Sequence, residues 1–306
     1  MKKQENQIKN ETMHVDQNEK AVENEIIVSK EESIETKPKL KYVLSKGRLF
    51  MSGFSLWRMI SKAKKMTKRI KSDPNSYSEE YRYNWMRKKI AKILKIPNIE
   101  MHVWGIENWL DKGVVIVPNH QSNLDPLMLI VLNDFSKQQP VSFIAKQESW
   151  KTKAVKHFMN LTDNVPIDRK SPRSALAAMK EAKELINEYK RAIVIFPEGT
   201  RSQGPVMNEF QSASMKLAQM AYAPIIPVSI IDSYKVYEKR KGRLPIKIIF
   251  GKPMLPNKFI SAKTNILTET VKREIQKNID KYKDVDLKSD KLVAKKYDKK
   301  NHIYYY

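Results

Sequence analysis

From residue 113 onward, short and strongly apolar runs alternate with longer segments of helical periodicity. Parallel strands need a crossover connection, usually a helix, so this alternation favours an α/β fold with a mostly parallel central sheet flanked by helices. We expect strands at 114–117, 141–145, 165–167, 192–196, 225–231 and 246–250, and helices at 122–134, 149–160, 209–221 and 261–282. Ser171 as N-cap and Pro172 at the first helical position mark one further helix start. In such sheets, ligands bind beyond the carboxyl ends of the strands.

A strongly basic segment precedes this pattern. Residues 41–99 hold 16 Lys and Arg against three acidic residues, whereas residues 1–38 hold six Lys and nine acidic residues. Within the basic segment, 47–71 predicts an amphipathic helix with aromatic residues on one side, and 78–95 predicts a second basic helix. Such a pattern is typical of an interfacial membrane anchor, and equally of a helix that packs on the domain with a solvated basic end.

These patterns divide the chain into four parts. Residues 1–40 are predicted to be a disordered polar segment, 41–99 a helical membrane-association segment, 100–284 the α/β domain, and 285–306 a Lys-rich mobile tail. The chain has no cysteine, which excludes disulfides and a thiol nucleophile. No run reaches the roughly 18 apolar residues of a membrane span, and the start is too polar for a signal peptide. We therefore expect a peripheral or monotopic protein on the cytoplasmic face of the cell membrane.

The net charge of +24 calls for a negatively charged partner. One alternative is a basic nucleic-acid-binding protein. The basic residues of 41–99 are interleaved with bulky apolar ones, however, and no zinc-finger or RNA-binding pattern is present. We therefore expect an anionic membrane surface as the partner, and no nucleic acid.

Polar residues follow two of the predicted strands. The first set, in "VIVPNHQSNLDP", contains His120 and, five residues on, Asp125. Within one helix these side chains would be about 140° apart. With His120 in the preceding loop and Asp125 in the first turn, the carboxylate can bond to one ring nitrogen, so that the other nitrogen accepts a proton from a hydroxyl group. This pair is a candidate catalytic dyad.

The second set, "FPEGTRS" at 196–202, combines an anion, a flexible backbone, a hydroxyl and a guanidinium. Glycine lets a backbone approach a ligand closely, and arginine holds phosphate oxygens in a bidentate fork. Two further cations, Arg169 and Lys146, end neighbouring strands. The candidate binding residues are Glu198, Gly199, Thr200, Arg201, Arg169 and Lys146. Taken alone, each loop also fits an ordinary polar turn.

These motifs resemble a known family. "NHQSNLDP" resembles the first motif of the glycerolipid acyltransferases, specifically the 1-acylglycerol-3-phosphate (lysophosphatidate) acyltransferases, and "FPEGTRS" resembles their third. "IIPVSI", 225–230, is similar to the apolar proline motif that follows. The resemblance covers about residues 100–255.

The resemblance implies a reaction and its residues. His120 would be the base, Asp125 its orienting partner, and Glu198, Gly199 and Arg201 contacts of the acceptor phosphate. The implied reaction transfers a fatty acyl group from an acyl carrier protein or coenzyme A thioester to the sn-2 hydroxyl of lysophosphatidic acid, which gives phosphatidic acid. No cofactor or metal is expected. An acyltransferase acting on another lysolipid or on glycerol phosphate would use the same residues.

Overall fold

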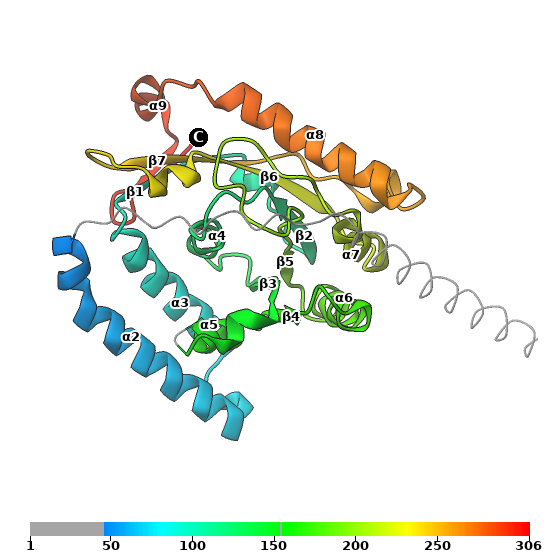
Figure 1. Ribbon diagram of the computed structural model, residues 1–306, viewed down its shortest axis with the longest axis horizontal. Helices are drawn as coiled ribbons and strands as arrows, with labels where there is room; N and C mark the ends of the chain where they lie inside the picture. The colour runs from blue at the N-terminus through cyan, green and yellow to red at the C-terminus, as the bar shows by residue number, and fades with distance from the viewer. Residues whose placement is uncertain (1–45, 154) are drawn as a thin grey trace, which may run out of the picture.

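The computed structural model describes residues 46–153 and 155–306. The predicted disordered segment, 1–40, lies outside the described residues. Within them, nine strands form one sheet in the order β4-β3-β5-β2-β6-β7-β1-β9-β8, with helices on both sides (Figure 1). The strands are β1 (Ile99–Trp104), β2 (Val114–Pro118), β3 (Val141–Lys146), β4 (Val165–Ile167), β5 (Ala192–Val194), β6 (Ile225–Ile231), β7 (Leu244–Phe250), β8 (Lys296–Asp298) and β9 (Ile303–Tyr305). The α/β class with a mostly parallel sheet is confirmed.

The direction of the strands decides where loops can meet. Strands β4, β3, β5, β2 and β6 run parallel to one another, so their carboxyl ends share one edge of the sheet. Strand β7 is antiparallel to β6, and β1 is parallel to β7. The carboxyl ends of β1 and β7 therefore lie at the opposite edge.

The helices pack in two layers against the sheet. They are α2 (Lys46–Ser72), α3 (Glu79–Leu94), α4 (Asp125–Leu132), α5 (Val155–Leu161), α6 (Pro172–Asn187), α7 (Lys216–Met220), α8 (Thr264–Tyr282) and α9 (Leu287–Val293). Ser171 caps α6 as predicted, with its hydroxyl accepting the N–H of Ser174 at 3.2 Å. None of the described helices combines the length and apolarity needed to cross a bilayer.

The alternation of side chains along β2 produces the layers. Val114 and Ile116 join the core formed with α2, α3 and α4, whereas Val115 and Val117 join the core formed with α6, α7 and α8. All four are fully buried. A strand buried on both faces is what a parallel sheet between two helical layers requires.

Several predicted boundaries differ from the structure. Helix α4 begins only at Asp125, because the Asp125 carboxylate accepts the N–H groups of Gln121 and Ser122 and holds them in a loop. The helix expected over 209–221 is reduced to α7 and a preceding 3₁₀ turn, because the N–H groups of Asn208 and Gln211 bond to the 196–202 loop. The expected helix over 149–160 is interrupted at Thr152, which is extended. Strand β1 has no counterpart in the predicted set.

The predicted mobile tail, 285–306, is folded in the structure. It forms α9, β8 and β9, and β9 pairs in parallel with β1. The buried His102 ring stacks against Tyr304 and Tyr306 and bonds through Nδ1 to the Tyr306 hydroxyl at 2.8 Å. The Lys-rich composition indicated a solvated tail. Instead, the segment with the terminal tyrosines pairs with β1, whose backbone groups on that side would otherwise be unpaired.

Candidate active site

The loop between β2 and α4 is fixed to β6. Asn119, fully buried, donates from Nδ2 to the carbonyl of Ile230 at 2.9 Å and accepts the Ile230 N–H at 2.7 Å. These two bonds extend the β2–β6 pairing by one residue through a side chain. His120, the next residue, is thereby held just beyond the carboxyl end of β2.

His120 and Asp125 meet as their spacing predicts. The Nδ1 atom of His120 lies 2.9 Å from the Oδ2 atom of Asp125, which is fully buried in the first turn of α4. The same carboxylate accepts the N–H groups of Gln121 at 2.7 Å and Ser122 at 2.8 Å. It also accepts the hydroxyls of Ser122 and Ser233, at 3.2 and 2.5 Å.

These contacts fix the tautomer of the imidazole. An ionised carboxylate only accepts hydrogen bonds, so Nδ1 of His120 carries the proton and Nε2 keeps its lone pair. The His120 ring packs against the ring of Phe196, with centroids 4.1 Å apart. Its Nδ1 is bonded to the carboxylate and its Nε2 has no partner among the described residues, so the imidazole is suited to act as a general base.

Two hydrogen bonds join the backbone of His120 to the 196–202 loop. The backbone N–H of His120 donates to Oε1 of Glu198 at 2.6 Å, and the N–H of Ser202 donates to the carbonyl of His120 at 2.7 Å. Oε2 of Glu198 accepts the N–H of Asn208 at 2.8 Å. Glu198 is buried behind the cavity described below, so it ties the two motifs together rather than contacting the cavity.

Gly199 allows an arginine to approach its backbone. Its φ is +68°, in the left-handed region, and a Cβ built there would lie 2.9 Å from Nη1 of Arg169. That Arg169 nitrogen donates to the Gly199 carbonyl. The missing side chain at Gly199 therefore leaves room for the guanidinium of Arg169.

Three cations gather beside this loop. The pKa of Lys146 is lowered by partial burial and by the positive charges of Arg169 and Arg201. Burial also lowers the pKa of Arg169. Among the described residues, neither Lys146 nor Arg201 forms an ion pair with a carboxylate. Like charges held together in this way favour a bound anion.

One cavity of about 640 Å³ joins the predicted residues. Its polar part is lined by His120, Lys146, Arg169, Gly199, Thr200 and Arg201. Its apolar part is lined by Leu56, Met59 and Ile60 of α2, and by Met86, Ile90 and Ile93 of α3. Of the eight site residues taken from the sequence, Asp125 and Glu198 lie behind the cavity wall and the other six line it.

The structure adds residues that the sequence did not reveal. Ser233, 108 positions after Asp125, bonds to its carboxylate, and its N–H donates to Oε1 of Gln121 at 3.0 Å. The residues around Ser233 give no indication of this role. Its position just after β6, the strand next to β2, could have suggested that it lies near Asp125. Ser122 and Phe196 stand within the two motifs, and their positions could have suggested a supporting role.

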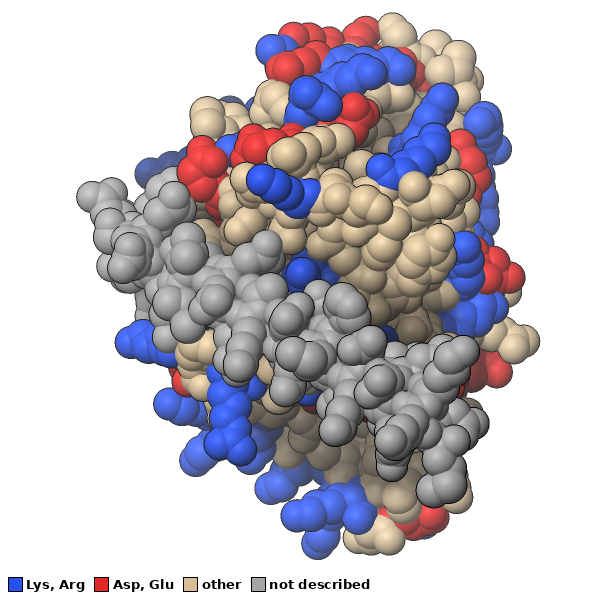
Figure 2. Space-filling model, turned by 90° about the vertical axis from the view of Figure 1, so that its right-hand side faces the viewer, with Lys and Arg blue, Asp and Glu red and all other residues tan. Residues whose placement is uncertain are grey.

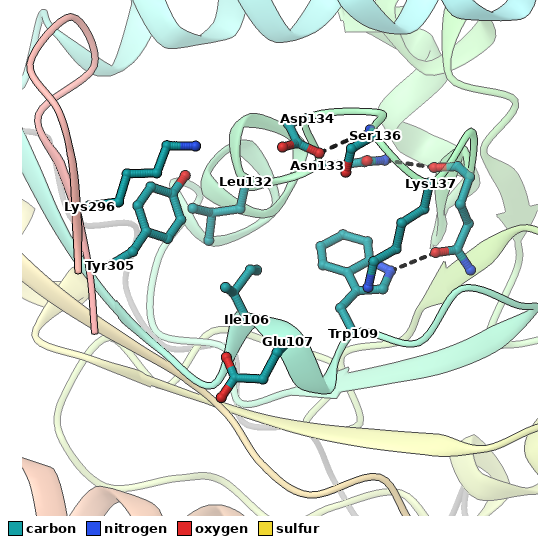
Figure 3. A pocket seen from close by; sticks show the side chains of 11 residues that line it. Ile106, Glu107, Trp109, Leu132, Asn133, Asp134, Ser136, Lys137, Lys296 and Tyr305 are labelled. Carbon is teal, nitrogen blue, oxygen red and sulfur yellow. Dashed lines mark hydrogen bonds between the residues drawn. The ribbon is translucent and has the colours of Figure 1, made fainter. Parts of the chain in front are cut away.

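A second cavity, of about 290 Å³, lies at the opposite edge of the sheet (Figure 3). It lies between the 3₁₀ turn Ile106–Asn108, the loop after α4 and the C-terminal hairpin, which contributes Lys296 and Tyr305. The indole N–H of Trp109 in its wall donates to Gln139 at 2.8 Å. None of the site residues taken from the sequence lines this cavity.

Comparison with known proteins identifies the class. A family model described as acyltransferase matches residues 100–231. This range contains both polar loops and all the residues of the polar part of the cavity. The part of the chain that holds the candidate site therefore resembles the acyltransferases.

Relatives narrow the class to a family. The probable 1-acyl-sn-glycerol-3-phosphate acyltransferase of Mycoplasma pneumoniae is 33% identical over 231 residues, which cover 70% of this chain and 84% of the relative. The Mycoplasma genitalium protein of the same description is 32% identical over 217 residues, 67% of this chain and 80% of the relative. The chain belongs to the 1-acyl-sn-glycerol-3-phosphate acyltransferase family, which confirms the resemblance seen in its motifs.

A solved structure shows the same fold. The crystal structure of the 1-acyl-sn-glycerophosphate (LPA) acyltransferase PlsC from Thermotoga maritima matches with a TM-score of 0.58 and 24% identity, and covers 78% of this chain and 90% of that chain. Membership of this enzyme family supports the acyltransferase rather than the alternative of a nucleic-acid-binding protein.

Proposed function

We propose that this enzyme transfers a fatty acyl group from an acyl thioester to the sn-2 hydroxyl of lysophosphatidic acid, forming phosphatidic acid at the cytoplasmic face of the cell membrane. The observation that carries the proposal is the shared cavity: His120 lines it together with Arg169 and Arg201, and its other part is apolar. An acceptor with a phosphate, a free hydroxyl and an acyl chain matches this order of groups.

In the proposed reaction, Nε2 of His120 takes the proton of the acceptor hydroxyl, whose oxygen attacks the thioester carbonyl. The tetrahedral intermediate collapses, the carbon–sulfur bond breaks, and the leaving thiolate takes the proton from His120, so that a free thiol departs and the base is restored. General-base catalysis of this kind contributes about 10²–10⁴-fold. Arg201 and Arg169 hold the phosphate and so orient the hydroxyl, while Lys146 adds charge to the same pocket.

The apolar part of the cavity is suited to an acyl chain. Residues of α2 and α3 line it, and Phe158 and Met159 of α5 complete it. Each buried methylene contributes about 0.8 kcal/mol, so the chain provides much of the binding free energy. The donor thioester is carried by acyl carrier protein or coenzyme A, and no bound cofactor or metal takes part.

Helix α2 supports association with a membrane. Phe50, Phe54 and Trp57 stand on one stripe of the helix and are 88%, 69% and 62% exposed. The second half of α2 carries six exposed cations, Lys62, Lys64, Lys65, Lys68, Arg69 and Lys71. At the corresponding level of the molecule, at the bottom of Figure 2, basic side chains outnumber acidic ones. Aromatic insertion together with attraction to anionic lipids holds such a helix at a membrane surface.

The proposal is tested with purified enzyme and labelled acyl donors on coenzyme A and on acyl carrier protein. The acceptors are lysophosphatidic acid, other lysophospholipids and glycerol 3-phosphate. We expect the highest kcat/KM with lysophosphatidic acid and phosphatidic acid as the product. A preference for glycerol 3-phosphate, or for a lysolipid without a phosphomonoester, would contradict the proposed acceptor.

A further inference from the structure

We propose that Arg58, Lys62, Lys89 and Lys92 form a second phosphate site, where α2 and α3 face each other, and that this site binds the phosphate of an anionic membrane lipid. None of the four lines the active-site cavity. The inference deepens the proposed membrane association, because it replaces a diffuse basic surface by one defined headgroup site. We call these four residues the interhelical cation cluster.

Two members of the cluster, one from each helix, lie beside the same aromatic ring. Nζ of Lys62 lies 5.8 Å from the centroid of the Trp85 ring, and Nζ of Lys89 lies 6.0 Å from it. Burial lowers the pKa of Lys89, and the nearby charges of Lys92, Lys62 and Arg58 lower it further. The four charges therefore act on one another within a small region that joins two helices.

The charge of the cluster is not balanced by acids. Lys62 donates to the Tyr81 hydroxyl at 2.9 Å, and none of the four forms an ion pair with a carboxylate among the described residues. By contrast, Arg82, also on α3, pairs with Asp163 at 3.0 Å. An anion bound between α2 and α3 would remove the mutual repulsion of the cluster.

The chemistry of the four cations indicates the ligand. A phosphate group offers several strong acceptor oxygens and matches both the fork of Arg58 and the ammonium groups. The ligand chemistry that fits the four cations is therefore a phosphate.

The neighbouring surface indicates that the phosphate belongs to a lipid. The guanidinium of Arg58 lies over the ring of Phe54, 5.8 Å from its centroid, and Phe54 stacks on Trp57 at 5.9 Å. The cluster is thus continuous with the exposed aromatic stripe of α2. A ligand with apolar chains beside its phosphate would contact both features, whereas free phosphate would contact only the cluster.

The test uses the full chain in an Arg201→Gln background, which weakens phosphate binding in the active site. Tryptophan fluorescence is followed during titration with dihexanoyl phosphatidylglycerol below its micellar concentration, with inorganic phosphate and with hexanoate. Trp85→Phe identifies the part of the signal that comes from Trp85. The double variant Lys62→Gln/Lys89→Gln is compared with Lys65→Gln/Lys68→Gln, which removes the same charge from positions of α2 outside the cluster.

We expect the lipid to bind more tightly than phosphate or hexanoate. Lys62→Gln/Lys89→Gln should weaken lipid binding at least about tenfold, and Lys65→Gln/Lys68→Gln less than about twofold. Equal losses in the two pairs would show diffuse attraction and overturn the site. Equal affinity for phosphate and lipid would overturn the lipid as its source, and equal affinity for hexanoate would overturn the phosphate chemistry. These readouts do not depend on turnover, so they stand apart from a failure of the proposed reaction.

Discussion

The backbone N–H of His120 donates to Oε1 of Glu198 at 2.6 Å, across 78 residues of sequence. The Ser202 N–H returns a bond to the His120 carbonyl at 2.7 Å. The loop that carries the candidate base and the loop that carries Arg201 are therefore hydrogen-bonded to each other, and a buried carboxylate forms one of the two links.

Glu198→Gln tests this link. The amide keeps one acceptor oxygen, but its NH₂ group would face the N–H of Asn208, two donors without an acceptor. We expect kcat to fall about tenfold to a hundredfold, and the free energy of unfolding to fall by about 1–3 kcal/mol. Steady-state kinetics and denaturant unfolding measure both.

Glu209→Gln is the matched control for that change. Glu209 lies in the same region, but its side chain is 73% exposed and pairs with Lys272. Exposed pairs contribute little, so both measurements should stay near wild type. If the two glutamine variants behave alike, Glu198 does not position His120.

Gly199→Ala tests the approach of Arg169. A Cβ there would meet the Arg169 guanidinium, and the positive φ adds roughly 1–2 kcal/mol of strain. We expect a lower melting temperature and a several-fold higher KM for lysophosphatidic acid. Gly204→Ala, two residues beyond that loop and with only an ordinary contact of 3.9 Å to the Ser202 carbonyl oxygen at its Cβ position, should change neither. An unchanged KM in Gly199→Ala would separate Arg169 from acceptor binding.

The lowered pKa of Lys146 predicts a pH dependence of acceptor binding. Burial, Arg169 and Arg201 disfavour its ammonium form, so the folded protein loses this charge at a lower pH than a free lysine would. KM for lysophosphatidic acid should therefore rise on the alkaline side. Lys146→Arg should abolish the rise, because a guanidinium keeps its charge. A rise of the same size in the variant would assign it to another group.

The lowered pKa of Lys146 also makes the free energy of unfolding depend on pH. Between the lowered pKa of folded Lys146 and the ordinary lysine pKa, the unfolded chain binds more protons than the folded chain. The contribution of Lys146 to the free energy of unfolding therefore increases with pH in that window. Comparison of Lys146→Gln with wild type across the window measures it.

The exposed aromatic residues of α2 predict membrane binding. Phe54→Ser/Trp57→Ser should weaken binding to anionic liposomes at least about tenfold, since each large apolar side chain contributes roughly 1.5–3 kcal/mol when fully buried. The control is Leu292→Ser/Val293→Ser on α9, whose side chains are 88% and 71% exposed. Similar losses for both pairs would place the membrane contact elsewhere.

The sequence predicted those features of the fold and the site that depend on neighbouring residues. The positions of His120 and Asp125 around the start of α4 and the capped start of α6 follow from capping and strand-end rules. The same rules brought Arg169 and Arg201 to one edge of the sheet. Each of these relations depends on a few neighbouring residues and on the parallel topology.

Relations across the fold were not predictable in the same way. The structural role of Glu198 depends on a bond to a loop 78 residues away, and Ser233 reaches Asp125 from 108 residues away. The folded C-terminal segment depends on the packing of Tyr306 against His102 and Trp104. Local composition contains none of this information, because these contacts exist only after the sheet has formed.

The most direct test of the central claim compares two acceptors that differ only in the phosphate, lysophosphatidic acid and 1-acylglycerol. If His120 and Arg201 act on one bound acceptor, His120→Ala should reduce kcat/KM for both acceptors about 10²–10⁴-fold. Arg201→Gln should reduce kcat/KM strongly for lysophosphatidic acid and leave that for 1-acylglycerol nearly unchanged. Equal losses for the two acceptors in Arg201→Gln would contradict the account.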